Sequence, residues 1–120
     1  MNPAGSVLLD TNIVVAHFRD DAGATAHLKS VSAIYLPWIA LGELEHGALR
    51  AQRPQVQLAL IREFLQVAIL LLPDQSTSER YGYIPDNDIW IAALARQYDL
   101  PLATRDAHFG AVERLRTLSR

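Results

Sequence analysis

The chain has 120 residues, enough for one domain, and 50% of them are hydrophobic against 20% charged, the balance of an ordinary globular protein. Cysteine is absent, which excludes disulfides, zinc–thiolate centres and thiol catalysis. The formal net charge is −2, and Lys29 is the only lysine, so composition alone does not indicate a nucleic-acid-binding surface.

Predicted strands and helices alternate along the chain, which favours a single α/β domain over residues 1–120, with a mostly parallel sheet between two layers of helices. In the first half of the chain we predict a strand at Ser6–Leu9, helices at Asn12–Arg19 and Ala24–Val31, a strand at Ile34–Leu36, and a helix from Pro37 to about Ala51. In the second half we predict a helix that begins at Pro54, a strand at Ala68–Leu72, a weakly helical segment at Ser76–Tyr83, a helix at Asp88–Tyr98 and a strand at Leu102–Thr104. Pro85–Asn87 is a turn and cap signal before the helix at Asp88–Tyr98. The segment Val112–Leu118 is predicted as a terminal helix or the remnant of a strand.

No part of the sequence predicts export or membrane insertion. The N-terminus lacks a basic region followed by a long apolar stretch, so it does not resemble a secretion signal. The apolar runs of the sequence, such as Val67–Leu72, are far shorter than the roughly 20 residues that a membrane helix needs. We therefore expect a cytoplasmic protein.

Four acidic residues stand at the edges of predicted elements. Asp10 follows the first strand, Glu43 lies in a helix, Asp88 opens a helix and Asp106 follows the last strand. Each has a simple structural interpretation as a turn former, a solvated helix acid, a favourable charge in a first helical turn or a loop cap. If the four converge instead, their mutual repulsion requires protons or a metal ion.

A cluster made only of carboxylates favours a hard cation, Mg²⁺ or Mn²⁺, and such ions support hydrolysis of phosphate esters without a protein nucleophile. Other catalytic patterns are weaker. The pair Glu43 and His46 matches half of a di-iron motif, but a bundle site needs two such pairs. Ser6 and Thr11 lack the glycine-flanked turn of an acyl-transfer nucleophile.

Four segments of the sequence together resemble the PIN domain, and within it the VapC toxins of bacterial toxin–antitoxin pairs. These segments are Leu8–Asn12, Leu41–Gly47, Asn87–Ala95 and Leu102–Asp106. The resemblance implies a metal-dependent endoribonuclease that cleaves RNA, often transfer RNA or ribosomal RNA. It also implies a VapB-like antitoxin and a homodimer.

The same resemblance assigns roles to individual residues. Asp10, Glu43, Asp88 and Asp106 match the family's acidic cluster, which implies that they bind the metal and carry catalysis. Asn12 and Thr104 match polar positions that support the cluster.

Two other functions remain open. A phosphatase of the haloacid dehalogenase type also has an aspartate after its first strand, but it needs a second one two residues later, where this chain has Asn12. A non-catalytic PIN-like scaffold that binds RNA or protein is the other alternative. The scaffold is favoured by the connection at Tyr83–Ile84, which is shorter than in similar proteins. The short connection indicates either a segment missing from the sequence or a real deletion, and a real deletion would favour domain swapping.

Two surfaces are candidates for partners. Apolar residues on the helices at Ile13–Phe18 and Leu41–Ala51 are expected to form an exposed groove for a helix of another protein. Four arginines gather toward the C-terminus, where they form either a local nucleic-acid contact or a solvated face: Arg105, Arg114, Arg116 and Arg120.

Overall fold

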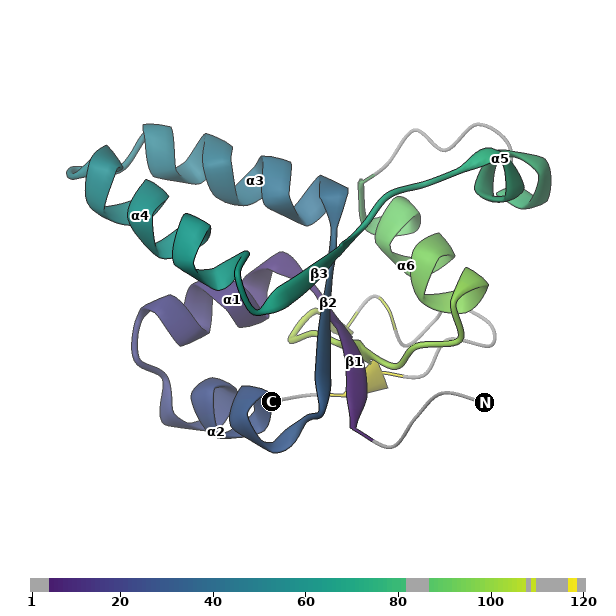
Figure 1. Ribbon diagram of the computed structural model, residues 1–120, viewed down its shortest axis with the longest axis horizontal. Coiled ribbons are helices and arrows are strands. Elements are labelled where there is room, and N and C mark those ends of the chain that lie inside the picture. The colour runs from purple at the N-terminus through teal and green to yellow at the C-terminus, as the bar shows by residue number, and fades with distance from the viewer. Residues whose placement is uncertain (1–4, 82–86, 108, 110–116, 119–120) are drawn as a thin grey trace.

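Figure 1 shows the protein as a computed structural model that describes residues 5–81, 87–107, 109 and 117–118, and of Tyr81, Asn87 and Asp88 only the backbone. In chain order the elements are β1 (Ser6–Leu9), α1 (Thr11–Phe18), α2 (Ala22–Ser30), β2 (Ala33–Pro37), α3 (Trp38–Leu49), α4 (Pro54–Phe64), β3 (Ala68–Leu71), α5 (Gln75–Tyr81), α6 (Asn87–Gln97), β4 (Leu102–Ala103) and β5 (Thr117–Leu118). The predicted α/β class is confirmed, and each predicted strand and helix is present with bounds that differ by a few residues.

The differences in the bounds have local causes. Helix α2 begins at Ala22 because the Asp21 side chain accepts a hydrogen bond from the Ala24 backbone and caps the helix there. Of the alternatives for the C-terminal segment, a short strand is present at Thr117–Leu118, while residues 112–116 lie outside the described part of the chain. The predicted cap at residues 85–86 and the short connection at 83–84 also lie outside it.

In the described part of the chain, the sheet has five parallel strands in the order β3-β2-β1-β4-β5. From β1 the chain moves outward through β2 to β3, and then returns to the other side of β1 to form β4 and β5. Successive crossovers in one direction cover one face of a sheet, and a reversal of direction moves the next crossover to the other face. Accordingly, α1 to α4 cover one side of the sheet, and α5 and α6 cover the other (Figure 1).

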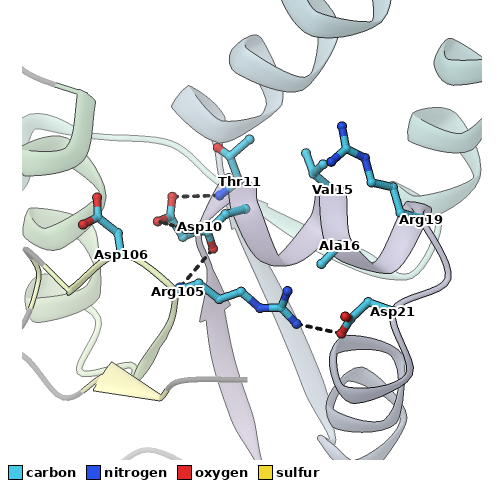
Figure 2. A pocket seen from close by; sticks show the side chains of 9 residues that line it. Asp10, Thr11, Val15, Ala16, Arg19, Asp21, Arg105 and Asp106 are labelled. Atoms are coloured by element: carbon cyan, nitrogen blue, oxygen red, sulfur yellow. Dashed lines mark hydrogen bonds and ion pairs between the residues drawn. The ribbon is translucent and has the colours of Figure 1, made fainter.

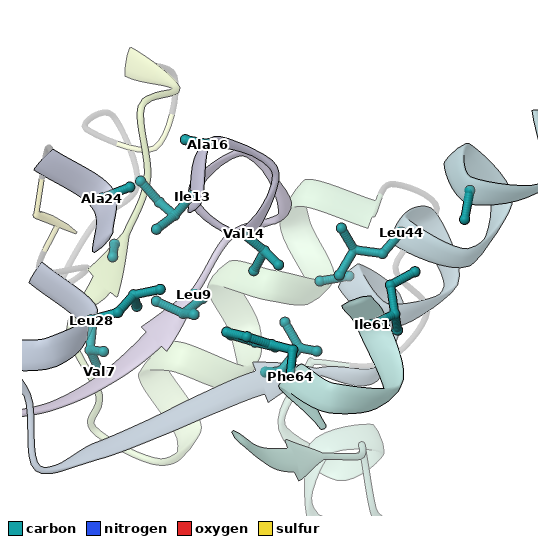
Figure 3. Close-up of a cluster of buried hydrophobic side chains, with 14 residues drawn as sticks. Val7, Leu9, Ile13, Val14, Ala16, Ala24, Leu28, Leu44, Ile61 and Phe64 are labelled. Carbon is teal, nitrogen blue, oxygen red and sulfur yellow. The ribbon is translucent and has the colours of Figure 1, made fainter. Parts of the chain in front are cut away.

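Two hydrophobic cores form, one on each face of the sheet. All four residues of β1 are buried, and neighbouring side chains point to opposite faces. Val7 and Leu9 pack with the first four helices in one core, to which α4 contributes Ile61 and Phe64 (Figure 3). Leu8 packs with α6 in the other core. This double burial fixes β1 in the centre of the sheet and fixes the position of the residue that follows it, Asp10.

Helix α6 is apolar nearly all round, as the sequence indicates, because it is packed from several sides. Ile91 and Leu94 have no exposed surface, and Ala95 has 1%. Trp90 meets Trp38 of α3 edge to face, with ring centroids 5.7 Å apart. This packing fixes the axis of the helix whose first turn contains Asp88. Among the described helices, none is long and apolar enough to cross a membrane.

Candidate active site

The site begins with Asp10, at the point where the strand order reverses between β1 and β4. In open α/β sheets the crevice at the carboxyl ends of such a strand pair is where ligands bind. The Asp10 backbone N–H donates to the Ala103 carbonyl of β4 at 2.9 Å, and Asp10 is the N-cap of α1. Only 6% of the residue is exposed. The fold therefore places a carboxylate, almost buried, at the expected crevice.

Both carboxylate oxygens of Asp10 accept hydrogen bonds. The Thr11 backbone N–H donates to Oδ1 at 2.8 Å. The Thr104 hydroxyl donates to Oδ2 at 2.7 Å, and the Asn12 amide donates to the same oxygen at 3.3 Å. Thr11 and Asn12 belong to α1, which follows β1, and Thr104 directly follows β4, so the carboxylate is held by the segments that follow both strands of the crevice. Asn12 and Thr104 thus contact the acid that they were expected to support.

Asp106 and Glu43 approach the same place from two other segments. The Asp106 backbone N–H donates to the Thr104 hydroxyl at 3.0 Å, which fixes the loop after β4 beside Asp10. Glu43 lies on the exposed surface of α3, where its Oε1 accepts a hydrogen bond from the Thr11 hydroxyl at 2.8 Å. Acids that are 33 and 96 residues from Asp10 in the sequence therefore meet at one edge of the sheet.

The charges of these acids act on one another. Burial raises the pKa of the Asp10 carboxyl above its ordinary value, and repulsion by Glu43 and Asp106 raises it further. The hydrogen bonds from Thr104 and Thr11 oppose that rise in pKa. Such a carboxylate carries negative charge that a bound cation would stabilise.

Asp88 lies in the first turn of α6 (Asn87–Gln97), and its side chain is outside the described part of the structure. Among the side chains that are described, no three acids or histidines are grouped closely enough to hold a metal ion. The role of Asp88 as a fourth ligand therefore stays a prediction.

An open cleft of about 540 Å³ lies in front of Asp10. Asp106 lines it on one side, and α1 lines it on the other, as Figure 2 shows. Three charged residues without a predicted role in the cluster also line the cleft: Arg19, Asp21 and Arg105. In the sequence Arg105 was noted as one of four C-terminal arginines, and Asp21 was given no role.

Thr11 is the other participant that the sequence analysis missed. Its backbone binds Asp10 and its hydroxyl binds Glu43, so this one residue connects two acids of the site. Its position directly after Asp10 was the available signal, because a residue in the first turn of a helix that follows a strand has its free N–H directed toward the ligand edge. By contrast, Glu45 and His46 are exposed, and His46 lies 3.5 Å from Arg50 on the helix surface, as expected for residues outside the site.

The sequence from residue 7 to residue 115 matches the family model of the PIN domain. The chain belongs to the PIN-domain family. This assignment decides against a phosphatase of the haloacid dehalogenase type. No curated protein sequence matches the chain.

Several solved structures share the fold of this PIN domain. VapBC2 from Rickettsia felis, bound to a DNA fragment from its promoter, has a TM-score of 0.85 at 20% identity, over 95% of this chain and 98% of that chain. DNA-bound VapBC from Salmonella typhimurium has a TM-score of 0.80 at 20% identity, over 95% and 97%. VapBC-1 from nontypeable Haemophilus influenzae has a TM-score of 0.77 at 21% identity, over 95% and 97%. At these identities the likeness establishes the common fold.

Proposed function

We propose that this PIN domain is a metal-dependent endoribonuclease and the toxin of a VapBC-type toxin–antitoxin pair. The observation that carries the proposal is the acidic cleft at the strand reversal, where the buried carboxylate of Asp10 is repelled by Glu43 and Asp106. The family supports a nuclease, and the VapBC complexes among its structural neighbours support the toxin assignment.

Asp10, Glu43, Asp88 and Asp106 would hold Mg²⁺ or Mn²⁺. The donors fit such an ion because they are all carboxylate oxygens, which hard cations prefer. Burial, and then repulsion by Glu43 and Asp106, raises the pKa of Asp10, and a bound cation would oppose both effects. When bound, the ion would neutralise the scissile phosphate and favour attack by water.

The residues around the acids have a separate task, which is to hold them in place. Thr11 and Thr104 fix the Asp10 carboxylate through donors on both of its oxygens, and the Thr11 hydroxyl fixes Glu43. No histidine, and no serine, is among the described residues that line this cleft. The arrangement therefore fits hydrolysis by water, without a covalent protein intermediate.

Incubation of the purified chain with total RNA should test this function. We expect cleavage with Mg²⁺ or Mn²⁺ and none when a chelator is present, with transfer RNA and ribosomal RNA examined separately for the preferred substrate. Glu43→Gln should lower the rate by about 10²-fold or more, since it removes one charge from the cluster. The matched control is Glu45→Gln, which changes an exposed acid on the same helix and should retain the wild-type rate.

Two results would contradict the proposal in different ways. Undiminished cleavage in chelator would require a mechanism without the metal. Stable RNA of every class in the presence of metal would leave the non-catalytic scaffold as the function of this fold.

The proposed antitoxin has a candidate binding groove. A pocket of about 290 Å³ lies between α1, α3 and α4, with Val15, Phe18 and Leu44 among its apolar lining and Glu43 at its polar side. Ile13 and Val14 of α1 are fully buried in the core, so the groove on this helix is lined by other apolar side chains, among them Val15 and Phe18. The groove would place a bound antitoxin helix next to the acidic cleft, since Thr11 and Arg19 line both.

Expression of the chain alone in a bacterial host should arrest growth, and co-expression of the cognate antitoxin should restore it. Asp10→Asn is the control, because it should leave growth unaffected at the same level of soluble protein. Normal growth with abundant wild-type protein would argue against a toxin. We further propose that the chain acts in the cytoplasm, where its RNA substrate lies, and that it forms a homodimer, which sedimentation would measure.

A further inference from the structure

An acidic cleft repels the substrate that it is proposed to cleave. Asp10, Glu43 and Asp106 bring negative charge together at the cleft, and a bound divalent ion neutralises only part of it. An RNA backbone adds more negative charge, so its phosphates need cationic side chains beside the cleft. Two basic residues are among the described residues that line this cleft, Arg19 and Arg105.

Arg105 is joined to the acid network and extends along the cleft. Its backbone N–H donates to the Asn12 side-chain oxygen at 3.2 Å. The amide nitrogen of Asn12 in turn donates to Asp10, so Asn12 connects Arg105 to the central acid. Its guanidinium reaches across to Asp21, with Nη2 and Oδ2 2.6 Å apart (Figure 2). The side chains of Arg105 and Asp21 are 38% and 39% exposed, so this ion pair is open to solvent and to a competing anion.

The backbone directs Asp21 toward that position. Asp20 has a positive φ of 61°, which ends α1, and the Asp21 N–H then donates to the Ala16 carbonyl at 3.0 Å. The Asp21 Oδ2 that pairs with Arg105 also accepts from the Ala24 N–H at 2.9 Å. Asp21 therefore keeps a role as the cap of α2 when Arg105 leaves it.

An exposed ion pair of this kind contributes little to stability, and a phosphate offers a guanidinium the same geometry of acceptors as a carboxylate. An RNA phosphate would therefore readily replace Asp21 as the partner of the Arg105 guanidinium. Arg19, at the end of α1, is exposed on the same cleft and makes no ion pair with any described residue.

We propose that Arg105 binds an RNA phosphate beside the acidic cleft, that Arg19 contacts the backbone further along, and that Asp21 holds Arg105 at the cleft while RNA is absent. This inference rests on the proposed ribonuclease function and names the residues that hold its substrate.

The test compares two substitutions that break the same ion pair. Binding of a fluorescent RNA hairpin with a single-stranded loop is measured by anisotropy at several salt concentrations, in an Asp10→Asn background that stops cleavage. Arg105→Gln should weaken binding about fivefold or more and reduce the slope of log K against log salt by about 0.7, the value for one phosphate contact on a single strand. Arg19→Gln should act in the same direction.

Asp21→Asn should have the opposite effect. It keeps the cap of α2, because an asparagine oxygen still accepts from Ala24, but it releases Arg105, so binding should tighten by up to about fivefold. This gain should disappear when Arg105→Gln is also present. Asp20→Asn removes the same charge from the neighbouring residue without touching the ion pair, and Arg62→Gln removes an exposed arginine of α4; both should leave the affinity near its starting value.

If Arg105 only clamps the loop after β4 to α2, Arg105→Gln and Asp21→Asn will change RNA binding in the same direction, which would overturn the inference. So would an unchanged salt slope in Arg105→Gln while the wild-type chain still cleaves RNA, and in that case the proposed function stands. A wild-type chain that neither binds nor cleaves RNA would overturn both.

Discussion

Asp10→Asn is expected to abolish RNA cleavage and leave the fold intact. The substitution keeps the size of the side chain and its acceptor for the Thr11 N–H, but it removes the charge nearest the centre of the site. We expect cleavage to fall by about 10³-fold or more, the order of loss when a central electrostatic group is removed from an active site. Binding of Mg²⁺ or Mn²⁺, measured by calorimetry, should be lost together with activity.

The variant should retain native stability because Asp10 is not a favourable charge in the metal-free chain. Its hydrogen bond with Thr104 can reverse direction, since the Thr104 hydroxyl can accept from an asparagine amide as well as donate to a carboxylate. The longer hydrogen bond from the Asn12 amide to the same oxygen would be lost, and the removal of repulsion from Glu43 and Asp106 opposes that loss. Retained RNA cleavage in a folded Asp10→Asn protein would show that the essential charge lies elsewhere.

The pH dependence of stability gives an independent measure of the same effect. The pKa of Asp10 is raised in the folded chain, so the unfolded chain loses its proton first as the pH rises. The metal-free wild type should therefore lose stability between the ordinary pKa of an aspartate and the raised one. Asp10→Asn has no proton to lose, so its advantage in free energy of unfolding should be absent at low pH and complete above the raised pKa. Each pKa unit of the shift corresponds to about 1.4 kcal/mol of that advantage.

Urea unfolding of both chains in chelator, from acidic to neutral pH, measures the difference directly. Other carboxyls, such as Asp21 and Asp74, have lowered pKa values, so the stability that they contribute to the protein is lost in acid. This loss is equal in both chains and cancels in the difference between their free energies of unfolding. A difference that grows toward low pH would mean that Asp10 is a stabilising charge.

The sequence was informative about the backbone of the site because its signals were local. The apolar run of β1 ends at Leu9, and burial of that run on both faces places Asp10 at the carboxyl end of the central strand. The four-segment resemblance then related Asp10 to Thr104 and Asp106, which no local pattern connects. These expectations could be formed because strand ends and element order follow from periodicity and topology.

The charged lining of the cleft could not be predicted in this way. Arg105 and Asp21 are 84 residues apart, and they meet because of the turn at Asp20 and the direction of a long flexible side chain. Asp20 gives no strong signal for a positive φ, since glycine is the usual residue there. Long side chains at the surface choose partners through the tertiary arrangement, so a sequence pattern leaves those partners open.

Thr104→Val is the second substitution from which we expect a large effect. The valine side chain has nearly the same shape, but it removes the hydroxyl that donates to Asp10 at 2.7 Å and accepts from the Asp106 N–H at 3.0 Å. Thr104 is only 4% exposed, so water cannot easily replace the hydroxyl. Asp10 and the backbone of Asp106 should each lose the hydrogen bond to Thr104 that holds them in place.

Because the Thr104 hydrogen bond is the largest of the effects that lower the pKa of Asp10, its removal should raise that pKa further. In the metal-free protein, carboxyl carbon NMR should record the rise, with Thr104→Ser restoring the wild-type value. Metal affinity should fall about 10- to 100-fold in Thr104→Val, as it does when an outer group that orients a ligand is lost, and should recover in Thr104→Ser. An Asp10 pKa that is the same in wild type and in Thr104→Val would contradict the assignment of Thr104 as the group that most strongly opposes the rise in the pKa of this carboxyl.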